Sequence, residues 1–119
     1  MQPLIVLLAL AASGANAWGV GFYNQCRDEV SPGYVEGSGT KGCEAVDNAD
    51  CMNGHAGDDL NGGGPTLFIC GYAAANCGHE NGYTSLDNVG GHAIINDGSN
   101  VKNIVSWGIT NDPNCGPAT

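Results

Sequence analysis

Few side chains in this sequence are suited to acid–base or nucleophilic chemistry. The chain contains three histidines, a single arginine and no serine in the G-x-S-x-G setting of a hydrolase elbow. Only His79 and Glu80 form an adjacent pair of a histidine and a carboxylate. Because neighbouring residues on a strand point to opposite faces, this spacing favours a solvated loop tip over a catalytic pair. We keep both residues as weak site candidates and predict that the protein is not an enzyme.

A second weak candidate is His55, which is close in sequence to Asp58 and Asp59. A histidine with two carboxylates is a donor set for a metal ion or for proton transfer. Calcium needs about six to eight oxygen ligands at alternating loop positions, and neither that ladder nor an EF-hand pattern occurs in the sequence. The glycine content of Gly54–Pro65 instead indicates an exposed loop. We therefore expect no cofactor and no bound metal.

The charge balance excludes several classes of partner. Only Arg27, Lys41 and Lys102 are basic, against twelve Asp and Glu, so the formal net charge is −9. Such a field repels nucleic-acid phosphate and anionic lipid, and we expect neither a nucleic-acid partner nor membrane binding. It favours solubility in extracellular fluid and, more specifically, the binding of a cation or of a basic partner.

Residues 1–17 are typical of a secretory signal peptide. Leu4–Ala12 is an unbroken apolar run, and Ala15 and Ala17 form the A-x-A pattern that signal peptidase cuts after. No Lys or Arg precedes the run, which departs from the usual positive start. The run is well short of the ~20 apolar residues that a membrane span needs. The sequence therefore predicts a secreted, extracellular protein.

We expect the mature chain to begin at Trp18 and residues 18–119 to form a single disulfide-rich domain. This length lies within the roughly 50–200 residues typical of one domain, and no linker or repeat divides it. The whole chain contains 20 glycines, which lose more backbone entropy on folding than any other residue. A domain of this composition needs support beyond its apolar core.

Six cysteines supply that support. They are Cys26, Cys43, Cys51, Cys70, Cys77 and Cys115. An even number in a secreted chain favours complete pairing, in any of several connectivities that the sequence leaves open. The alternative is a metal site, but no C-x-x-C or H-x-x-x-H pair occurs. Each disulfide would stabilise the fold by roughly 3 kcal/mol through restriction of the unfolded chain.

The architecture is predicted to be all-β. Strand-like runs alternate with Asn-Gly and Asp-Gly pairs, which are the strongest short signals for tight hairpins. The runs are Val20–Cys26, Thr66–Tyr72, Tyr83–Leu86, His92–Ile95 and Val101–Ile109. The turn pairs are Asn53-Gly54, Asn61-Gly62, Asn81-Gly82 and Asp97-Gly98. We expect a small antiparallel sandwich of hairpins held together by disulfides.

The clearest unit is a hairpin over His92–Ile109 with its turn at Asn96–Asn100. One face of its second strand carries the apolar residues Val101, Val105, Trp107 and Ile109. Lys102 and Ser106 fall on the other face, and this period of two is typical of a half-buried strand. We expect Trp107 to be buried against the opposite sheet.

A helix is conceivable only over Glu44–Met52. Val46, Ala49 and Met52 have helical spacing there, but nine residues make a marginal helix without tertiary support. The predicted class is therefore all-β, or β-rich with one short helix.

The leader, the acidic Gly- and Asn-rich composition, the six cysteines and the closely spaced hairpins resemble the small secreted cysteine-rich proteins of filamentous fungi. The resemblance covers the whole chain and is one of format. Many such proteins are effectors or effector candidates. The resemblance implies a non-catalytic protein that acts outside the cell on a host or a competing microbe, by binding an extracellular protein or glycan that the sequence does not identify.

Val20–Cys26 and Asn76–Trp107 show a fainter resemblance to βγ-crystallin-type modules. Such modules often bind calcium through paired Asx residues followed by Ser/Thr-Ser. Here Asn96–Asn100 places its serine one position early and lacks the second, and Asp87–Gly91 lacks both. The resemblance implies a crystallin-like fold, with calcium binding as an alternative function.

Another alternative is a small secreted hydrolase similar to the fungal guanyl-specific ribonucleases, which are likewise small, acidic and disulfide-bonded. Their chemistry needs a Glu/His acid–base pair and an arginine that clamps the phosphate. This chain offers Arg27 alone, followed by Asp28 and Glu29, whose charges oppose its field. The extracellular interaction protein therefore remains the leading hypothesis.

Overall fold

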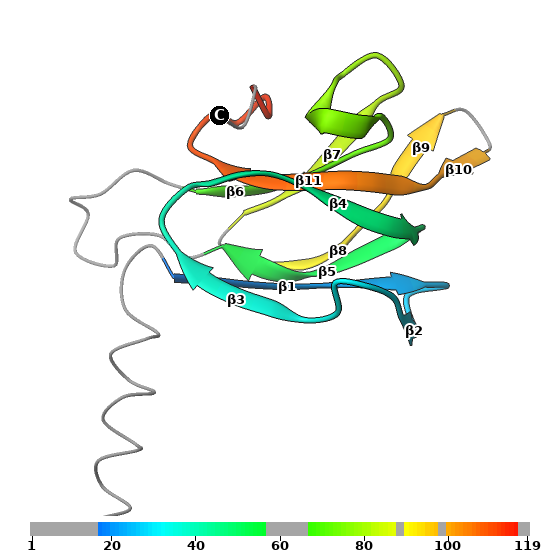
Figure 1. Cartoon of the computed structure of the whole chain (residues 1–119), viewed down its shortest axis with the longest axis horizontal. Helices are drawn as coiled ribbons and strands as arrows, with labels where there is room; N and C mark the ends of the chain where they lie inside the picture. Colours follow the sequence, from blue (N-terminus) through cyan, green and yellow to red (C-terminus); the bar gives the residue numbers. More distant parts are fainter. Residues whose placement is uncertain (1–16, 57–66, 88–89, 98–99, 117–119) are drawn as a thin grey trace, which may run out of the picture.

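The computed structural model describes residues 17–56, 67–87, 90–97 and 100–116. Its main strands form two antiparallel sheets that lie face to face with an apolar core between them (Figure 1). We call them the lower and the upper sheet, after their positions in Figure 1. The expected all-β class, with antiparallel sheets and disulfides, is confirmed.

The lower sheet is built around β1 (Ala17–Asn24). β5 (Cys51–Ala56) pairs along one edge of β1, and β8 (Gly91–Ala93) pairs in turn with β5. Two short strands share the other edge: β3 (Val35–Ser38) pairs with the beginning of β1 and β2 (Asp28–Glu29) with its end. β1 is thus hydrogen-bonded on both sides, and its side chains alternate between the core and the outer surface.

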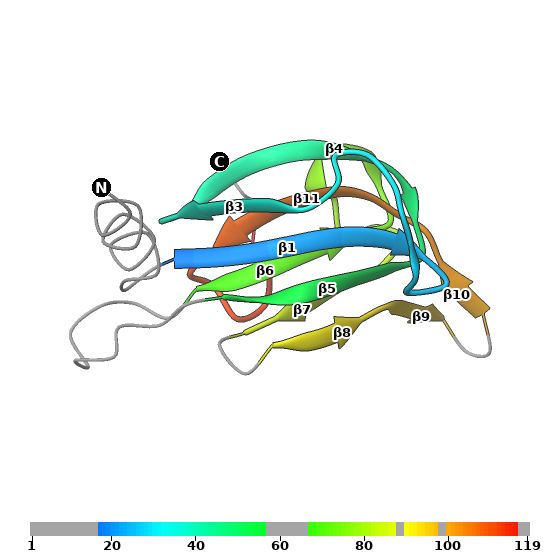
Figure 2. The same ribbon diagram turned by 90° about the horizontal axis from the view of Figure 1, so that it is seen from below.

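The upper sheet has the strand order β4-β11-β6-β7. These strands are β4 (Lys41–Ala49), β6 (Phe68–Tyr72), β7 (Tyr83–Leu86) and β11 (Ile104–Thr110). The remaining elements are the 3-10 helix η1 (Ala75–Cys77) and a separate two-stranded hairpin of β9 (Ile95–Asp97) and β10 (Asn100–Lys102). Figure 2 shows β3 and β4, which are edge strands of the two sheets, on the same side of the molecule.

An aromatic cluster joins the two sheets. Trp18, Val20 and Phe22 occupy alternate positions of β1, and none is more than 5 % exposed. From β11, Trp107 packs edge-on against Trp18, with ring centroids 5.6 Å apart, and lies 5.4 Å from Phe22. Trp107 is completely buried. The predicted burial of this residue against the opposite sheet is confirmed.

The predicted common face of Val101, Val105 and Trp107 is wrong for Val101. Val101 belongs to β10, which pairs with β9 across residues 98–99 (themselves outside the described ranges), and it is 49 % exposed. Trp107 belongs to β11, a separate strand in which Val105 is only half-buried. Ile104 enters the core instead, because the register between β4 and β11 shifts after this residue.

Glu44–Met52 does not form the short helix that its spacing allowed. These residues form the end of β4, a bend and the start of β5. Val46 and Ala49 are both buried because β4 pairs irregularly with β11 here and Asn48 adopts a left-handed φ of 55°. A bulged strand of this kind can place two inward residues at a spacing of three, which imitates a helix. Nor does any helix in the described ranges have the length and apolar character of a membrane span.

The turn pairs have different outcomes. Asn81-Gly82 forms the expected turn: the Gly82 N–H donates to the His79 carbonyl at 3.0 Å, and Gly82 has a φ of 102°. Asn53-Gly54 is not a turn, since both residues lie within β5 and pair with β1. The predicted loop is accordingly wrong over Gly54–Ala56, and its remainder falls in residues 57–66, outside the described residues.

All six cysteines are paired, as predicted. The disulfides are Cys26–Cys51, Cys43–Cys77 and Cys70–Cys115. The first joins the β1–β2 turn to β5 in the lower sheet. Cys43–Cys77 attaches η1 to β4 of the upper sheet. Cys70–Cys115 attaches the C-terminal segment (residues 111–116) to β6 of the same sheet. The cross-links therefore hold peripheral segments onto strands that already carry the core.

Replacing Trp107 by alanine should lower the free energy of unfolding by about 3–5 kcal/mol, because a fully buried indole is lost from beside Trp18 and Phe22. Urea unfolding followed by circular dichroism measures the change. Val101→Ala is the control and should cost less than about 0.5 kcal/mol, since this side chain is half-exposed. Equal stability of Trp107→Ala and the wild type would contradict the proposed core.

Reduction of the disulfides should unfold or greatly loosen the protein, whereas a chelator should change its melting temperature little. Loops of 25 to 45 residues correspond to roughly 3.5–4 kcal/mol per disulfide in the chain-entropy picture. Thermal melts with a reductant and with EDTA measure the two effects. A large loss with EDTA alone would revive the calcium-binding alternative, because a stabilising ligand raises the melting temperature by mass action.

Candidate functional site

The weak candidates from the sequence do not form one site. His55 lies in β5 with its side chain exposed on the outer surface of the lower sheet. His79 and Glu80 precede β7, which belongs to the upper sheet, and both are exposed. Asp58 and Asp59 lie outside the described residues. The structure thus separates His55 from the pair His79-Glu80.

His79 is exposed, but its ring belongs to an aromatic stack. The ring lies 4.5 Å from that of Tyr83 and 5.7 Å from that of Tyr72, measured between centroids. The Tyr72 hydroxyl donates a hydrogen bond of 3.2 Å to the carbonyl of Cys115, and Nε2 of His79 contacts the same oxygen. Burial, followed by the charge of Asp112 and the proximity of Tyr83, raises the pKa of Tyr72. The histidine therefore helps to hold the C-terminal segment against the upper sheet.

The outer surface of the upper sheet is covered by the chain itself. Ser106, on β11, is only 2 % exposed; its hydroxyl donates to the Ala74 carbonyl at 2.6 Å and accepts from the Cys77 N–H at 2.9 Å. Cys70 and Cys115 lie with Tyr72 and Cys77 in a second buried cluster. The predicted exposed position of Ser106 is wrong, because η1 and the C-terminal segment pack over β11.

The outer surface of the lower sheet is open in the part of the chain that the structure describes. In Figure 1 the strands of the upper sheet all lie on the other side of the lower sheet. The inward aromatic and valine side chains of β1 alternate with Gly19, Gly21 and Tyr23, which face outward. Gly19 and Gly21 therefore leave two outward positions of the central strand without a side chain, yet both residues are buried.

Two tyrosine rings lie across these glycines. A Cβ atom added to Gly19 would stand 2.1 Å from the hydroxyl of Tyr34, and one added to Gly21 would stand 2.3 Å from the hydroxyl of Tyr23. The rings occupy the space that side chains at these glycines would need. Tyr34 is 49 % exposed and Tyr23 is half-buried. We call these four residues the tyrosine face.

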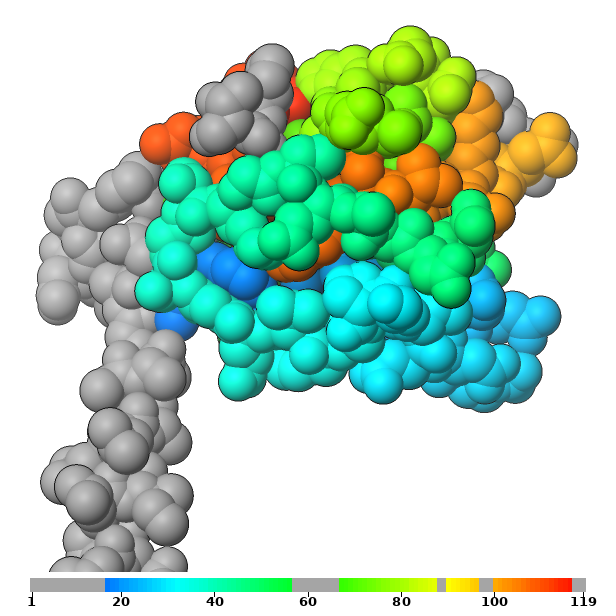
Figure 3. All heavy atoms as spheres, in the orientation of Figure 1, coloured from blue at the N-terminus to red at the C-terminus, as the bar shows by residue number. Residues whose placement is uncertain are grey.

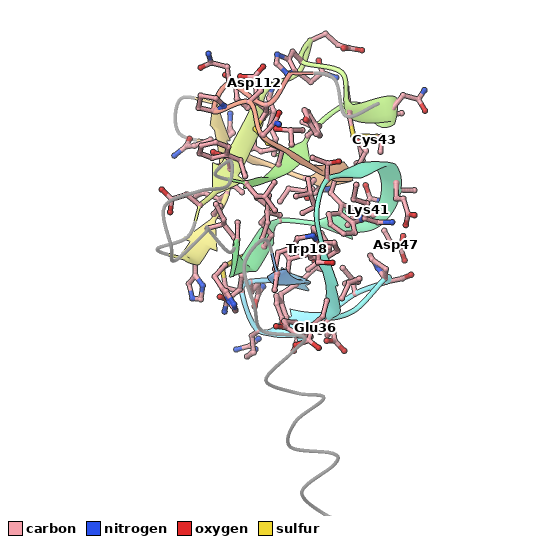
Figure 4. The ribbon with its side chains drawn as sticks, turned by 90° about the vertical axis from the view of Figure 1, so that its left-hand side faces the viewer. Trp18, Glu36, Lys41, Cys43, Asp47 and Asp112 are labelled. Atoms are coloured by element: carbon pink, nitrogen blue, oxygen red, sulfur yellow. A yellow bond between two sulfur atoms is a disulfide. The ribbon has the colours of Figure 1, made fainter. Side chains whose placement is uncertain are left out.

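Two carboxylates flank the tyrosine face. Residues directly opposite each other in antiparallel strands project on the same side of the sheet. Glu36 of β3 lies opposite Gly19, and Glu29 of β2 lies opposite Tyr23. Both glutamates are exposed. Figure 4 shows Glu36 at the outer side of the lower sheet, whereas Trp18 lies between the two sheets.

On its β5 side, the tyrosine face is bordered by histidine and asparagine side chains. His55 lies opposite Gly19, and Asn53 lies opposite Gly21. His92 of β8 extends the second row, since it pairs with Asn53. His55 and His92 are exposed, and Asn53 is half-buried. Of the weak candidates within the described ranges, His55 alone therefore lies beside the tyrosine face.

The pKa of Tyr34 reflects the electrostatic environment of the tyrosine face. Partial burial raises this pKa above the ordinary value of 10.0, and the charge and hydrogen bonding of the Glu36 carboxylate and the proximity of Tyr23 raise it further. A carboxylate stabilises the neutral phenol because it repels the phenolate and accepts a hydrogen bond from the hydroxyl. The aromatic surface thus lies in a negative local field.

A separate hollow lies between the edges of the two sheets. Figure 3 shows atoms of β1 and β11 in the gap between β3 and β4. Lys41 of β4 extends over Trp107, with Nζ 5.7 Å from the ring centroid, and pairs with Glu44 at 2.7 Å. The buried Nε1 of Trp107 has no hydrogen-bond partner among the described residues. This hollow exposes little of either tryptophan, since Trp18 is 5 % and Trp107 0 % exposed.

Metal sites and phosphate clamps gain no support from the described residues. No group of three or more His, Cys, Asp or Glu side chains in these ranges could hold a metal ion. The two stretches compared with crystallin calcium motifs include residues 88–89 and 98–99, which are not described. Arg27 pairs with Asp28 at 3.6 Å and donates to Gln25 at 2.9 Å, so its charge is partly offset, as its neighbours in the sequence suggested.

Comparison of the chain with protein-family models, with curated proteins and with solved structures found no match. Function must therefore be inferred from the surface of the chain itself.

Sequence reasoning missed the residues of the tyrosine face. A signal was present: in Trp18–Tyr23 (WGVGFY) bulky residues alternate with glycines, which predicts a strand with one smooth side. Tyr34 gave no such signal. Its position over Gly19 depends on the pairing of β3 with β1, which brings residues distant in sequence together.

Glu36→Gln should lower the pKa of Tyr34 toward its ordinary value of 10.0, because one cause of the upward shift is removed. Titration of the tyrosine ring signals by NMR measures the midpoint, and Glu80→Gln is the control. Since the raised pKa belongs to the folded state, its contribution to stability is fully present below the unfolded pKa and is lost as pH rises through the folded pKa. Equal Tyr34 midpoints in the wild type and Glu36→Gln would refute the contact.

Proposed function

We propose that this protein is a secreted, non-catalytic interaction protein, effector-like in character, that binds an extracellular partner through the tyrosine face. It acts on a host or a competing microbe. The resemblance in format to the small secreted cysteine-rich proteins of filamentous fungi supports this assignment.

The observation that carries the proposal is the pair of tyrosine rings laid across the glycines of β1. Tyrosine is enriched at the energetic centres of interfaces because it presents a large apolar ring and a polar hydroxyl with few rotatable bonds. Here Tyr34 is 49 % exposed, and its hydroxyl lies over Gly19, where a Cβ atom would stand 2.1 Å away. Such a surface can meet a partner with little loss of side-chain entropy.

The disulfides support the extracellular location. Disulfides of this kind persist in oxidising environments and are rare in the cytosol. Cleavage after Ala17 would leave the mature chain beginning at Trp18, one residue into β1, with the inward aromatic residues of that strand retained. The signal peptide and the paired cysteines are thus both consistent with secretion.

Binding assays with surface variants test the proposal. Tagged mature protein would be used to capture partners from the extracellular fluid of a host, and each captured protein would be purified and its affinity measured directly. We expect a partner whose affinity falls about tenfold or more in Tyr34→Ala, as for an interface hot spot. Tyr83→Ala, which changes an exposed tyrosine of the upper sheet, is the matched control.

Two results would overturn the proposal. The first is a partner that binds Tyr34→Ala and Tyr83→Ala as tightly as the wild type, because the tyrosine face would then have no role. The second is turnover of RNA or glycan substrates by the purified protein, which would favour the hydrolase alternative.

A further inference from the structure

We infer that the partner site on the tyrosine face is built for a positively charged polypeptide segment, in which lysine or arginine side chains project at alternate positions. This inference rests on the proposed function and names the chemistry of the partner. Three features of the tyrosine face support it: two aromatic rings, two flanking carboxylates and the spacing of the glycines beneath the rings.

The rings and the carboxylates together favour a cation. A lysine ammonium or an arginine guanidinium is attracted to the face of a tyrosine ring, and a carboxylate beside the ring adds a charge-assisted hydrogen bond. Tyr34 has Glu36 beside it, and Tyr23 has Glu29 directly opposite. Each ring is thus paired with one carboxylate on the same side of the sheet.

The spacing favours an extended chain. Gly19 and Gly21 are two residues apart on one strand, so the positions over which the rings lie repeat at about 6.7 Å. Alternate side chains of an extended peptide repeat at the same distance. A peptide running along β1 would therefore place successive cationic side chains over Tyr34 and Tyr23.

The rest of the charge distribution is complementary to such a partner. The three basic residues are engaged elsewhere: Arg27 with Asp28, Lys41 with Glu44, and Lys102 with the Asn81 carbonyl at 3.2 Å. With a net charge of −9, the protein as a whole attracts cationic ligands and speeds their encounter. The local carboxylates then decide where on the protein the ligand docks.

A defined probe tests the inference: a peptide of alternating lysine and serine, added to isotopically labelled mature protein at neutral pH. We expect NMR shifts centred on the amides of Gly19 and Gly21, and an affinity that weakens as salt is raised. Tyr34→Ala and Glu36→Gln should each weaken binding about three- to fivefold, since an exposed cation–π or ion pair has this strength. A peptide with glutamate in place of lysine should not bind.

The charge control separates local recognition from attraction to the net charge. Glu80→Gln removes one negative charge, as Glu36→Gln does, but from the loop before β7 of the upper sheet. Equal weakening by the two variants, or by Tyr83→Ala and Tyr34→Ala, would overturn the inference and leave only non-specific attraction. Glu36→Gln is isosteric and its site is exposed, so folding is preserved in the decisive comparison.

The remaining outcomes are also decisive. If an oligosaccharide of glucosamine binds at the tyrosine face and the lysine peptide does not, the partner is a glycan and the inference is wrong. If neither probe binds while Tyr34→Ala still abolishes capture of the extracellular partner, the proposed function stands and its cationic character is refuted.

Discussion

The contact of Trp107 with Trp18 and Phe22 is the interaction on which the rest of the structure depends. It joins β11 of the upper sheet to β1 of the lower sheet through rings whose centroids lie 5.4 and 5.6 Å apart. Once these side chains point inward, the pleat of β1 determines that Gly19 and Gly21 point outward. The core and the tyrosine face are therefore two sides of one strand.

The outer surfaces of the two sheets are covered in different ways. The upper sheet is closed by η1 and the C-terminal segment, which Cys43–Cys77 and Cys70–Cys115 fasten to it. In the described part of the lower sheet, two tyrosine rings lie over the glycines of the central strand. Two of the three disulfides thus fasten segments over the upper sheet, whereas the third, Cys26–Cys51, lies in the lower sheet and leaves its tyrosine face exposed.

The sequence predicted the local features well and the distant ones poorly. The burial of Trp107 and the full pairing of the cysteines follow from periodicity and composition, and the five predicted runs overlap β1 and β6 to β11. Strands β2 to β5 were not predicted, because their residues lack a clear alternation of apolar and polar side chains. The helix predicted over Glu44–Met52 is wrong because the bulge at Asn48 places Val46 and Ala49 on the same side of a strand at helical spacing. Ser106 misled because nothing local reveals that η1 covers it. The tyrosine face required the pairing of β3 with β1, which periodicity does not encode.

Gly19 and Gly21 constrain how the tyrosine face can change during evolution. The rings of Tyr34 and Tyr23 lie over Gly19 and Gly21 of β1, on the side of the strand away from the core. Substitutions at these two positions would change the outer surface of the lower sheet and would leave the core side chains Trp18, Val20 and Phe22 in place. The glycines, in contrast, are held in place by steric demand, because a methyl group at either one would displace a ring. Tyr23 and Tyr34 can therefore be replaced more readily than Gly19 and Gly21, so the side chains on this surface can diverge while the backbone beneath them stays the same.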